Sequence, residues 1–356
     1  EIKVLDGAKV SVTSEDETTG PGIQIARNPG SVGSFVADGQ DTLVEVNQSG
    51  PILESLGFGP FVTFGRSGAG TGEIRNGATV SISGPEAVVD VSRGNADEFD
   101  DPADAPTLDE SVLRVLSGGQ LIAEGTPDLP ATMAVGRETN GDGRLEIKGD
   151  GSLVQVGVAN GGRFLVGSDF DFESQTPQLE SGGTGVVSIA NGGMLEAGAA
   201  AGDGVSDIFV GDGGTLEVQN EGTLNGDVEV SVNGSFTLAD GGTVNGDFVL
   251  RGTDTADVFS IEGTIDGLRA FTSGNDTIDL SKLGLTGDTS AIADFSFDGP
   301  AEGANFPSAV AFGSDGSNGR LFIDANSSGS FESADDVIID LLGVTTAPEI
   351  SDLTFS

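Results

Sequence analysis

Near its middle the chain reads Gly143-Arg144-Leu145-Glu146-Ile147-Lys148-Gly149-Asp150-Gly151-Ser152-Leu153-Val154-Gln155-Val156. Apolar side chains stand at every second position on both sides of the turn Gly149-Asp150-Gly151. This is the pattern of two short β-strands joined by residues that tolerate positive φ. Because strands of about five residues cannot bury an apolar face alone, such pairs of strands must stack on further pairs.

The same phrase returns with variations along the chain, at residues 70–82, 185–197 and 214–224. A repeat of roughly 20 residues is typical of solenoids, so we expect an all-β chain folded as a β-solenoid (β-helix) with coils of about this length. The alternative is a β-sandwich with Gly-rich turns. Sandwich strands are usually about 5 or 6 residues long at 8–12-residue spacing and lack a recurring turn phrase.

The repeat predicts a solenoid domain over residues 1–250 and a separate domain over residues 251–356. Two insertions near 95–110 and 168–181 interrupt the repeat; the first combines acidic residues with proline, and both are expected to be exposed loops. After residue 250 phenylalanine becomes frequent and the turn phrase is lost. We expect the second domain to be an antiparallel, β-rich cap, which closes the exposed edge of a solenoid.

The charge of the chain restricts its partners. The 356 residues include 15 Lys and Arg against 57 Asp and Glu, a formal net charge of −42. This charge excludes nucleic acid as a natural partner and disfavours an anionic membrane. Self-repulsion of this size favours neutralisation by cations, and carboxylate oxygens are the ligands that Ca²⁺ prefers. A protein from salty surroundings, acidic for solvation alone, is the other interpretation.

Several reactive side chains are missing from the sequence. The chain has no Cys, which excludes disulfides and thiolate metal sites, and no His, Trp or Tyr. Without His, catalysis would depend on Asp, Glu, Lys, Arg or Ser, so we expect no enzyme. No apolar run reaches the roughly 18 residues that a membrane-spanning segment requires.

Residues 324–335 have the spacing of a calcium loop. Oxygen-bearing side chains stand at positions 1, 3 and 5, glycine at position 6, an apolar residue at position 8 and a carboxylate at position 12. The candidate calcium ligands are Asp324, Asn326, Ser328, Ser330 and Asp335. The alternative is a plain turn formed by Asn and Ser.

A resemblance covers about the last hundred residues. The segments Ala256-Asp257-Val258-Phe259, Gly274-Asn275-Asp276-Thr277-Ile278-Asp279-Leu280 and Ile350-Ser351-Asp352-Leu353-Thr354-Phe355 resemble the C-terminal region of calcium-binding repeats-in-toxin proteins. The resemblance implies export by bacterial type I secretion and makes Asp254, Asp257, Asp276 and Asp279 candidate calcium ligands. The chain lacks the tandem Gly-Gly-x-Gly-x-Asp array of that family, so the stacked calcium roll is not implied.

The solenoid domain, residues 1–250, resembles the β-helical passengers of autotransporters and other large surface proteins in architecture. Together these features predict a secreted or cell-surface bacterial protein that assembles with copies of itself, through calcium, into a layer, filament or extracellular matrix. One alternative is an adhesin whose two insertions bind a cell-surface polysaccharide or protein. The other is a β-helical enzyme that degrades polysaccharides.

Overall fold

The computed structural model describes residues 1–356 except 16–19, 51–58, 95–107, 172–173, 199–206, 239–241, 247, 253–257, 261–266, 270, 300, 302, 333–335 and 356. The described residues form β-strands and two short 3-10 helices, with no α-helix among them. The prediction of an all-β chain is confirmed. Within the described ranges, no helix is long and apolar enough to cross a membrane.

The chain divides into two compact units. Unit 1 comprises residues 1–228 and 233–246, and unit 2 comprises residues 229–232 and 247–356. The domain assignment made from the sequence, with its boundary between residues 250 and 251, stays a prediction.

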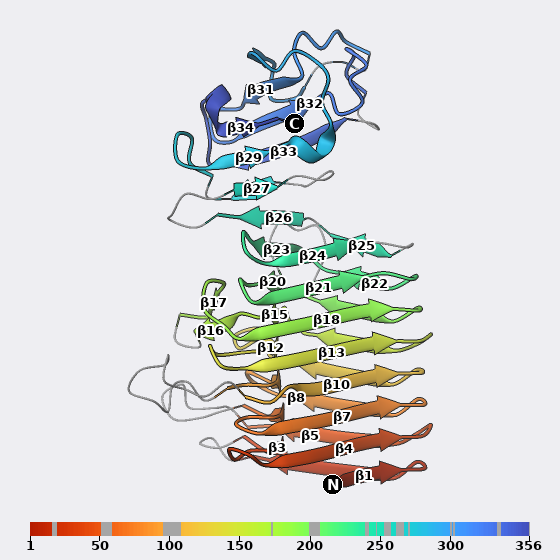
Figure 1. The fold of residues 1–356 in the computed structure, drawn as a ribbon. Coiled ribbons are helices and arrows are strands. Elements are labelled where there is room, and N and C mark those ends of the chain that lie inside the picture. Colours follow the sequence, from red (N-terminus) through yellow and green to blue (C-terminus); the bar gives the residue numbers. More distant parts are fainter. Residues whose placement is uncertain are drawn as a thin grey trace. The chain divides into compact units, whose positions relative to one another are not determined.

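Unit 1 contains three sheets whose strands run parallel within each sheet (Figure 1). Sheet A contains β1 (Ile2–Leu5), β4 (Val32–Asp38), β7 (Ala69–Arg75), β10 (Ser111–Leu116), β13 (Asp142–Lys148), β18 (Thr184–Ala190), β21 (Gly214–Val218) and β24 (Ser235–Leu238). Sheet B contains β2 (Lys9–Ser14), β5 (Leu43–Gln48), β8 (Thr79–Ser83), β11 (Gln120–Glu124), β14 (Leu153–Val156), β19 (Met194–Ala197), β22 (Thr223–Asn225) and β25 (Thr243–Asn245). In unit 1, sheet C contains β3 (Gly22–Ile25), β6 (Phe61–Phe64), β9 (Val88–Val91), β12 (Ala131–Val135), β15 (Gly162–Val166) and β20 (Ile208–Val210).

Successive strands of one sheet lie further apart in the sequence than expected. Ser111 of β10 pairs with Gly143 of β13, and Asp142 pairs with Thr184 of β18. The expected repeat of roughly 20 residues holds only near the end, where Thr215 pairs with Ser235. The expectation was wrong for most strand pairs because the recurring phrase covers the strands of sheets A and B. Each coil contains in addition a strand of sheet C and its two connections, which vary in length.

The interior of unit 1 is built from aligned columns of apolar side chains. In sheet A the register places Val4, Ala37, Ile74, Val115, Ile147, Ile189 and Val218 at equivalent positions in successive strands. All of these side chains are buried. Side chains of a strand alternate between its two faces, so the apolar residues of each alternating segment all point inward. Each strand therefore adds one side chain to each column.

Turn residues with positive φ connect sheet A to sheet B. Asn76 and Gly77 have φ of 56° and 82°, and Asn191 and Gly192 have φ of 54° and 80°. Asn and Gly adopt this conformation at lower cost than other residues, which is why these pairs recur between alternating segments. The predicted role of the turn phrase is confirmed at these corners.

The second insertion folds back onto unit 1. It forms an antiparallel hairpin of β16 (Asp169–Asp171) and β17 (Thr176–Gln178). Phe170 and Leu179 are buried with Ala134, Leu165 and Phe209 of the outer face of sheet C. The expectation of an exposed loop was wrong for Phe170 and Leu179, whose apolar side chains cover sheet C. Ser174, Thr176, Gln178 and Glu180 of the same insertion are exposed, as expected. Residues 95–107, most of the first insertion, lie outside the described residues.

Unit 2 has a mixed sheet with strand order β23 (Val228–Ser231), β26 (Phe248–Arg251), β28 (Gly267–Arg269), β33 (Val337–Leu342), β32 (Gly319–Ile323), β31 (Val310–Ser314) and β30 (Ile292–Asp294). Only β31, β32 and β33 pair in antiparallel fashion among these described strands, so the sheet is not wholly antiparallel as expected. A second sheet contains β27 (Val258–Ser260), β29 (Thr277–Asp279) and β34 (Leu353–Thr354). The 3-10 helices are η3 (Ser281–Leu283) and η4 (Ile350–Asp352).

Candidate functional site

The predicted calcium loop follows strand β32 directly. Asp324 is buried, with a relative exposure of 3%. One of its carboxylate oxygens accepts a hydrogen bond from the backbone N–H of Ser328 at 3.0 Å, and the other accepts one from Gly329 at 2.9 Å. Gly329 has a φ of +75°, which glycine adopts without strain. The loop therefore curls around the Asp324 carboxylate.

The next predicted ligands lie on the same loop. The Asn326 side chain accepts from the Ser328 N–H at 2.8 Å and donates to a Glu332 carboxylate oxygen at 2.7 Å. The Ser328 hydroxyl accepts from the N–H of Ser330 at 3.1 Å. Asn326 and Ser328 belong to the solvent-accessible side of the loop, where a dissolved cation could reach them. Asp335, the predicted last ligand, lies outside the described residues.

Asp336 is a loop carboxylate that the spacing argument missed. Its relative exposure is 5%, and its two oxygens accept from the backbone N–H groups of Ala325 at 3.2 Å and Glu332 at 2.8 Å. Burial raises the pKa of Asp336, and the charge of Asp324 raises it further. Two buried carboxylates thus lie close enough for the charge of one to destabilise the charge of the other.

The donor chemistry of this loop fits Ca²⁺, which takes carboxylate, amide, hydroxyl and backbone oxygens. Asp324, Asp336, Asn326 and Glu332 supply oxygens of these kinds within one short loop. Among the described residues, no group of three or more Asp, Glu, His or Cys side chains is arranged to hold a metal ion. The loop therefore offers suitable donors without a preformed cluster of charged ligands.

The candidate ligands of the repeats-in-toxin resemblance lie elsewhere in unit 2. Asp276 and Asp279 lie just before β29 and at its end. Asp276 is 2% exposed and accepts from the Thr272 N–H at 2.6 Å, and Asp279 accepts from the Ser281 N–H at 2.9 Å. These bonds cap local backbone, a structural role. Asp254 and Asp257 fall outside the described residues.

Asp352 is a further buried carboxylate that the sequence analysis did not single out as a ligand. It is 4% exposed and accepts from the Ser273 hydroxyl at 2.6 Å, the Gly274 N–H at 3.1 Å and the Glu349 N–H at 2.9 Å. It ties the turn before β29 to the segment around η4. The only sequence signal was its place in the closing segment Ile350-Ser351-Asp352, which was noted for its resemblance alone.

Comparison of the chain with family models, with curated proteins and with solved structures finds no match. Any assignment of function to this chain therefore depends on its own residues.

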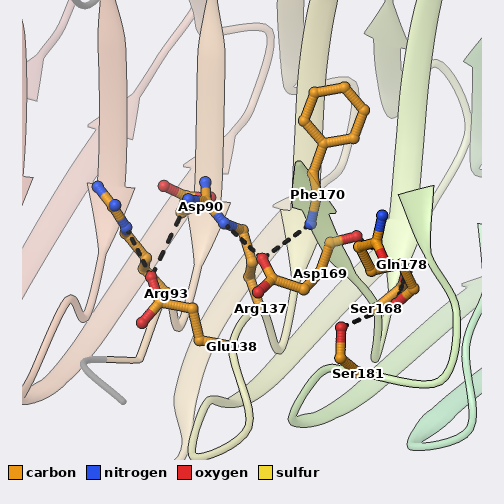
Figure 2. A network of polar contacts seen from close by, with 9 residues as sticks. All are labelled: Asp90, Arg93, Arg137, Glu138, Ser168, Asp169, Phe170, Gln178 and Ser181. Carbon is orange, nitrogen blue, oxygen red and sulfur yellow. Dashed lines mark hydrogen bonds and ion pairs between the residues drawn. The ribbon is translucent and has the colours of Figure 1, made fainter. Parts of the chain in front are cut away.

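Unit 1 contains a buried network of charged side chains (Figure 2). Arg137, 5% exposed, lies 3.3 Å from a carboxylate oxygen of Asp90, which is 2% exposed, and 3.3 Å from one of Asp169. Glu138 lies 4.0 Å from Arg137 and 3.0 Å from Arg93. Because Arg137, Asp90 and Glu138 are shielded from solvent, they do not contact a dissolved substrate in this conformation.

The network holds the β16–β17 hairpin against sheet C. Asp169, the first residue of β16, accepts from Arg137. The Arg163 guanidinium lies 5.2 Å from the centre of the Phe170 ring and donates to Gln175 at 3.2 Å. Gln175 in turn donates to Glu86 at 3.3 Å. Sequence alone could not find these contacts, because they join residues that are distant in the sequence and that only the folded chain brings together.

Removing the charge of Glu86 is expected to flatten the pH dependence of stability. Burial raises the pKa of the Glu86 carboxyl above its usual value, against smaller effects of the Gln175 hydrogen bond and the Arg137 charge. A raised pKa in the folded state means that the protonated form favours folding, so stability falls as pH rises through that pKa. We expect Glu86→Gln to be at least as stable as the parent at about pH 7 and to converge with it at about pH 4.

Urea denaturation across this pH range measures the effect. Glu45→Gln, which removes one negative charge from an exposed position of β5, is the control for net charge. A Glu86→Gln variant whose stability falls with pH as steeply as that of the parent would contradict the expectation.

Proposed function

We propose that this chain is a secreted structural protein of the bacterial cell surface, in which a β-solenoid assembles with copies of itself into a layer, filament or extracellular matrix, with calcium as the controlling ion. The observation that carries the proposal is the in-register stacking of eight parallel strands in each of sheets A and B. Such stacking gives unit 1 extended sheet faces, which suit lateral association.

The order in which the chain visits the sheets supports the solenoid. Consecutive strands β1, β2 and β3 belong to sheets A, B and C, and β4, β5 and β6 pair with them in the same order. Each of these pairings is parallel. A chain that returns to the same three sheets in the same order, always in parallel, winds as a coil.

The charge of the chain supports a cation as part of the assembly. Copies with a formal net charge of −42 repel one another, and Ca²⁺ reduces that repulsion by binding carboxylates. The predicted calcium loop holds the buried carboxylates of Asp324 and Asp336 close together, an arrangement that a divalent cation stabilises. Asn326 and Glu332 would complete the oxygen donors of that site.

Removing calcium is expected to disperse the assembly. We expect light scattering of the full chain to rise when millimolar Ca²⁺ is added and to fall again with a chelator, since binding to the folded and assembled form shifts the equilibrium toward it. Asp324→Asn is expected to weaken calcium binding by roughly tenfold or more, measured by titration calorimetry, because it removes one ligand charge.

Asp315→Asn is the matched control. Asp315 is an exposed loop residue of unit 2 that accepts from the N–H groups of Ser317 and Asn318, both at 2.7 Å. This variant should leave calcium binding unchanged. Scattering that is indifferent to both calcium and chelator would contradict the function proposed, and equal calcium affinity of the parent and Asp324→Asn would contradict the site.

The adhesin hypothesis takes second place. It requires the two insertions to present their side chains to a glycan or protein, whereas Phe170 and Leu179 of the second insertion are buried against sheet C. The hypothesis of a polysaccharide-degrading enzyme stays a prediction from the sequence, which an assay for reducing sugars on acidic glycans would test.

A further inference from the structure

The outer face of sheet A carries a regular grid of side chains over β4, β7, β10 and β13. Figure 1 shows these four strands one above the other in one sheet. We call the outward side chains of these four strands the charged face. Its charged members are Asp38, Glu73, Arg75, Arg114, Asp142, Arg144, Glu146 and Lys148.

Ion pairs cross this face from strand to strand. Arg75 lies 3.0 Å from Asp38 of β4 and 2.7 Å from Glu73 of its own strand. Arg114 lies 3.1 Å from Glu146, which also lies 3.3 Å from Lys148. The side chains in these four ion pairs are between 22% and 39% exposed. The face is therefore accessible, and its charges are locally balanced.

The other two faces of unit 1 are less suited to a second acidic molecule. On the outer face of sheet C, Ala134 and Leu165 are fully buried beneath the hairpin. In sheet B, Lys9 is the only basic residue of the described strands, against Glu45, Glu124 and Glu196. In a chain with 57 acidic and 15 basic residues, the charged face is where a like molecule meets least repulsion.

The strand register sorts these charges into columns that run across the strands. One column aligns Asp38, Arg75 and Lys148 with the apolar Leu116. The next column aligns Val36, Glu73, Arg114 and Glu146. In each column, one acidic residue on one side of the β7–β10 boundary has a basic counterpart at the same distance on the other side. Asp38 of β4 corresponds in this way to Lys148 of β13, and Glu73 of β7 corresponds to Arg114 of β10.

Resting on the self-assembly proposed above, we propose that a second copy docks with its own charged face on this one, about a two-fold axis that lies between the two faces, parallel to the strands and over the β7–β10 boundary. Rotation about this axis places each column of one copy opposite the same column of the partner. It reverses the order of the strands, so β7 lies opposite the partner's β10 and β4 opposite the partner's β13. Asp38 then faces the partner's Lys148, and Glu73 faces the partner's Arg114. The symmetry forms each of these contacts twice.

The remaining charges of the face meet no like charge in this arrangement. Arg75 faces the partner's Leu116, and Glu146 faces the partner's Val36. An axis over β7 itself would instead place Glu73 opposite the partner's Glu73. Like charges that face each other across an interface are unfavourable, so the charge pattern disfavours an axis over β7. An axis over the β10–β13 boundary would form only the contact of Arg114 with the partner's Glu146, whereas the β7–β10 boundary forms two kinds of opposite-charge contact.

The size of the face suits a reversible contact. About this axis the six strands from β1 to β18 overlap with those of the partner. At about 4.8 Å between strands and about six residues a strand, they cover roughly 600 Å² in each copy. Two copies then bury about 1,200 Å², the lower limit for a specific interface. An interface of this size is typical of weak or transient association.

Complementary charge reversals test the orientation. Arg114→Glu with Lys148→Glu places acid opposite acid at all four contacts, and Asp38→Lys with Glu73→Lys places base opposite base. Sedimentation velocity of the full chain in calcium should show each double variant associating with itself at least tenfold more weakly than the parent. An equimolar mixture should recover association to within about threefold of the parent. Each reversal also places like charges beside each other within its own sheet, for example Glu73 and Glu146 beside Arg114→Glu. Circular dichroism therefore checks that both variants fold, and recovery of association in the mixture requires that they do.

Lys9→Glu is the matched control for the single variant Arg114→Glu, because the two change the net charge equally. Lys9→Glu lies on sheet B and should associate like the parent, whereas Arg114→Glu should be weakened. Because the chain has no Cys, a single spin label can also be attached at Thr71→Cys on β7, with Ser81→Cys on β8 as the control. The distance between the labels of two associated copies is expected to be shorter at Thr71→Cys than at Ser81→Cys.

The outcomes separate this inference from the proposed function. If the parent assembles with calcium but both double variants associate as Lys9→Glu does, the docking surface is wrong and the proposed function stands. If each double variant is weakened but the mixture stays dispersed, the two-fold arrangement is wrong. A parent that remains monomeric at every calcium and protein concentration overturns both.

Discussion

Replacing Arg137 with alanine is expected to lower the free energy of unfolding of unit 1 by about 3–5 kcal/mol. The side chain is 6% exposed and lies between the carboxylates of Asp90 and Asp169. Alanine leaves Asp90, itself 2% exposed, without this positive partner in a region of low dielectric constant. Removing one member of a buried ion pair costs more than the pair contributes, because the remaining charge stays buried.

Urea denaturation followed by far-ultraviolet circular dichroism measures this loss, since the chain has no Trp or Tyr for fluorescence. Arg75→Ala is the matched control, because Arg75 also pairs with two carboxylates but its side chain is 39% exposed. It should cost about 0–1 kcal/mol. Equal losses for the two variants would show that burial of the network contributes nothing. Faster proteolysis within 168–181 in Arg137→Ala is also expected, because Arg137 holds Asp169 of the hairpin.

Replacing Gly136 with alanine is expected to cost at least about 3 kcal/mol, since two separate penalties add. Gly136 has a φ of +72°, a conformation that costs an L-residue about 1–2 kcal/mol. A Cβ at this position would also stand 2.0 Å from the backbone oxygen of Thr184 in β18. Because the nearest atom belongs to the backbone, relief of the clash requires the two backbone segments to separate.

Gly161→Ala isolates the conformational penalty. Gly161 has nearly the same φ, +76°, but no atom lies within 4 Å of the position that its Cβ would take. We expect only the conformational cost of about 1–2 kcal/mol for this variant, measured by the same urea titration. If Gly136→Ala and Gly161→Ala lose equal stability, the close approach of Thr184 does not limit this position.

The strands of unit 1 and the turns between sheets A and B could be predicted from the sequence, because both depend on the order of neighbouring residues. Alternation around Gly149-Asp150-Gly151 predicts β13 and β14, which the structure places at residues 142–148 and 153–156. The number of residues between two paired strands could not be predicted in this way. The 168–181 hairpin lengthens the connection between β15 and β18, and a long connection leaves little trace in the periodicity of the strands that it joins.

The candidate calcium site was found only in part. The spacing of Asp324, Asn326 and Ser328 was sufficient to find the loop, since ligands on one loop depend on local sequence. Asp336 was missed because its role depends on backbone N–H groups of Ala325 and Glu332, which the folded loop directs toward it. The spacing of ligands in a calcium loop gives their positions in the sequence but does not predict which backbone N–H groups point toward Asp336.

By itself the sequence determined the all-β character of the chain, its turn residues and its excess of negative charge. The strands and turns depend on neighbouring residues, and the net charge is a total over all residues. Only the tertiary structure decided which side chains meet. The Arg137 network and the columns that align Asp38 with Lys148 join residues tens of positions apart. The register of parallel strands sets the columns, and the packing of the β16–β17 hairpin against sheet C brings Asp169 to Arg137. A shift of one residue in that register would turn every outward charge toward the core, so the faces of the stack are a property of the fold.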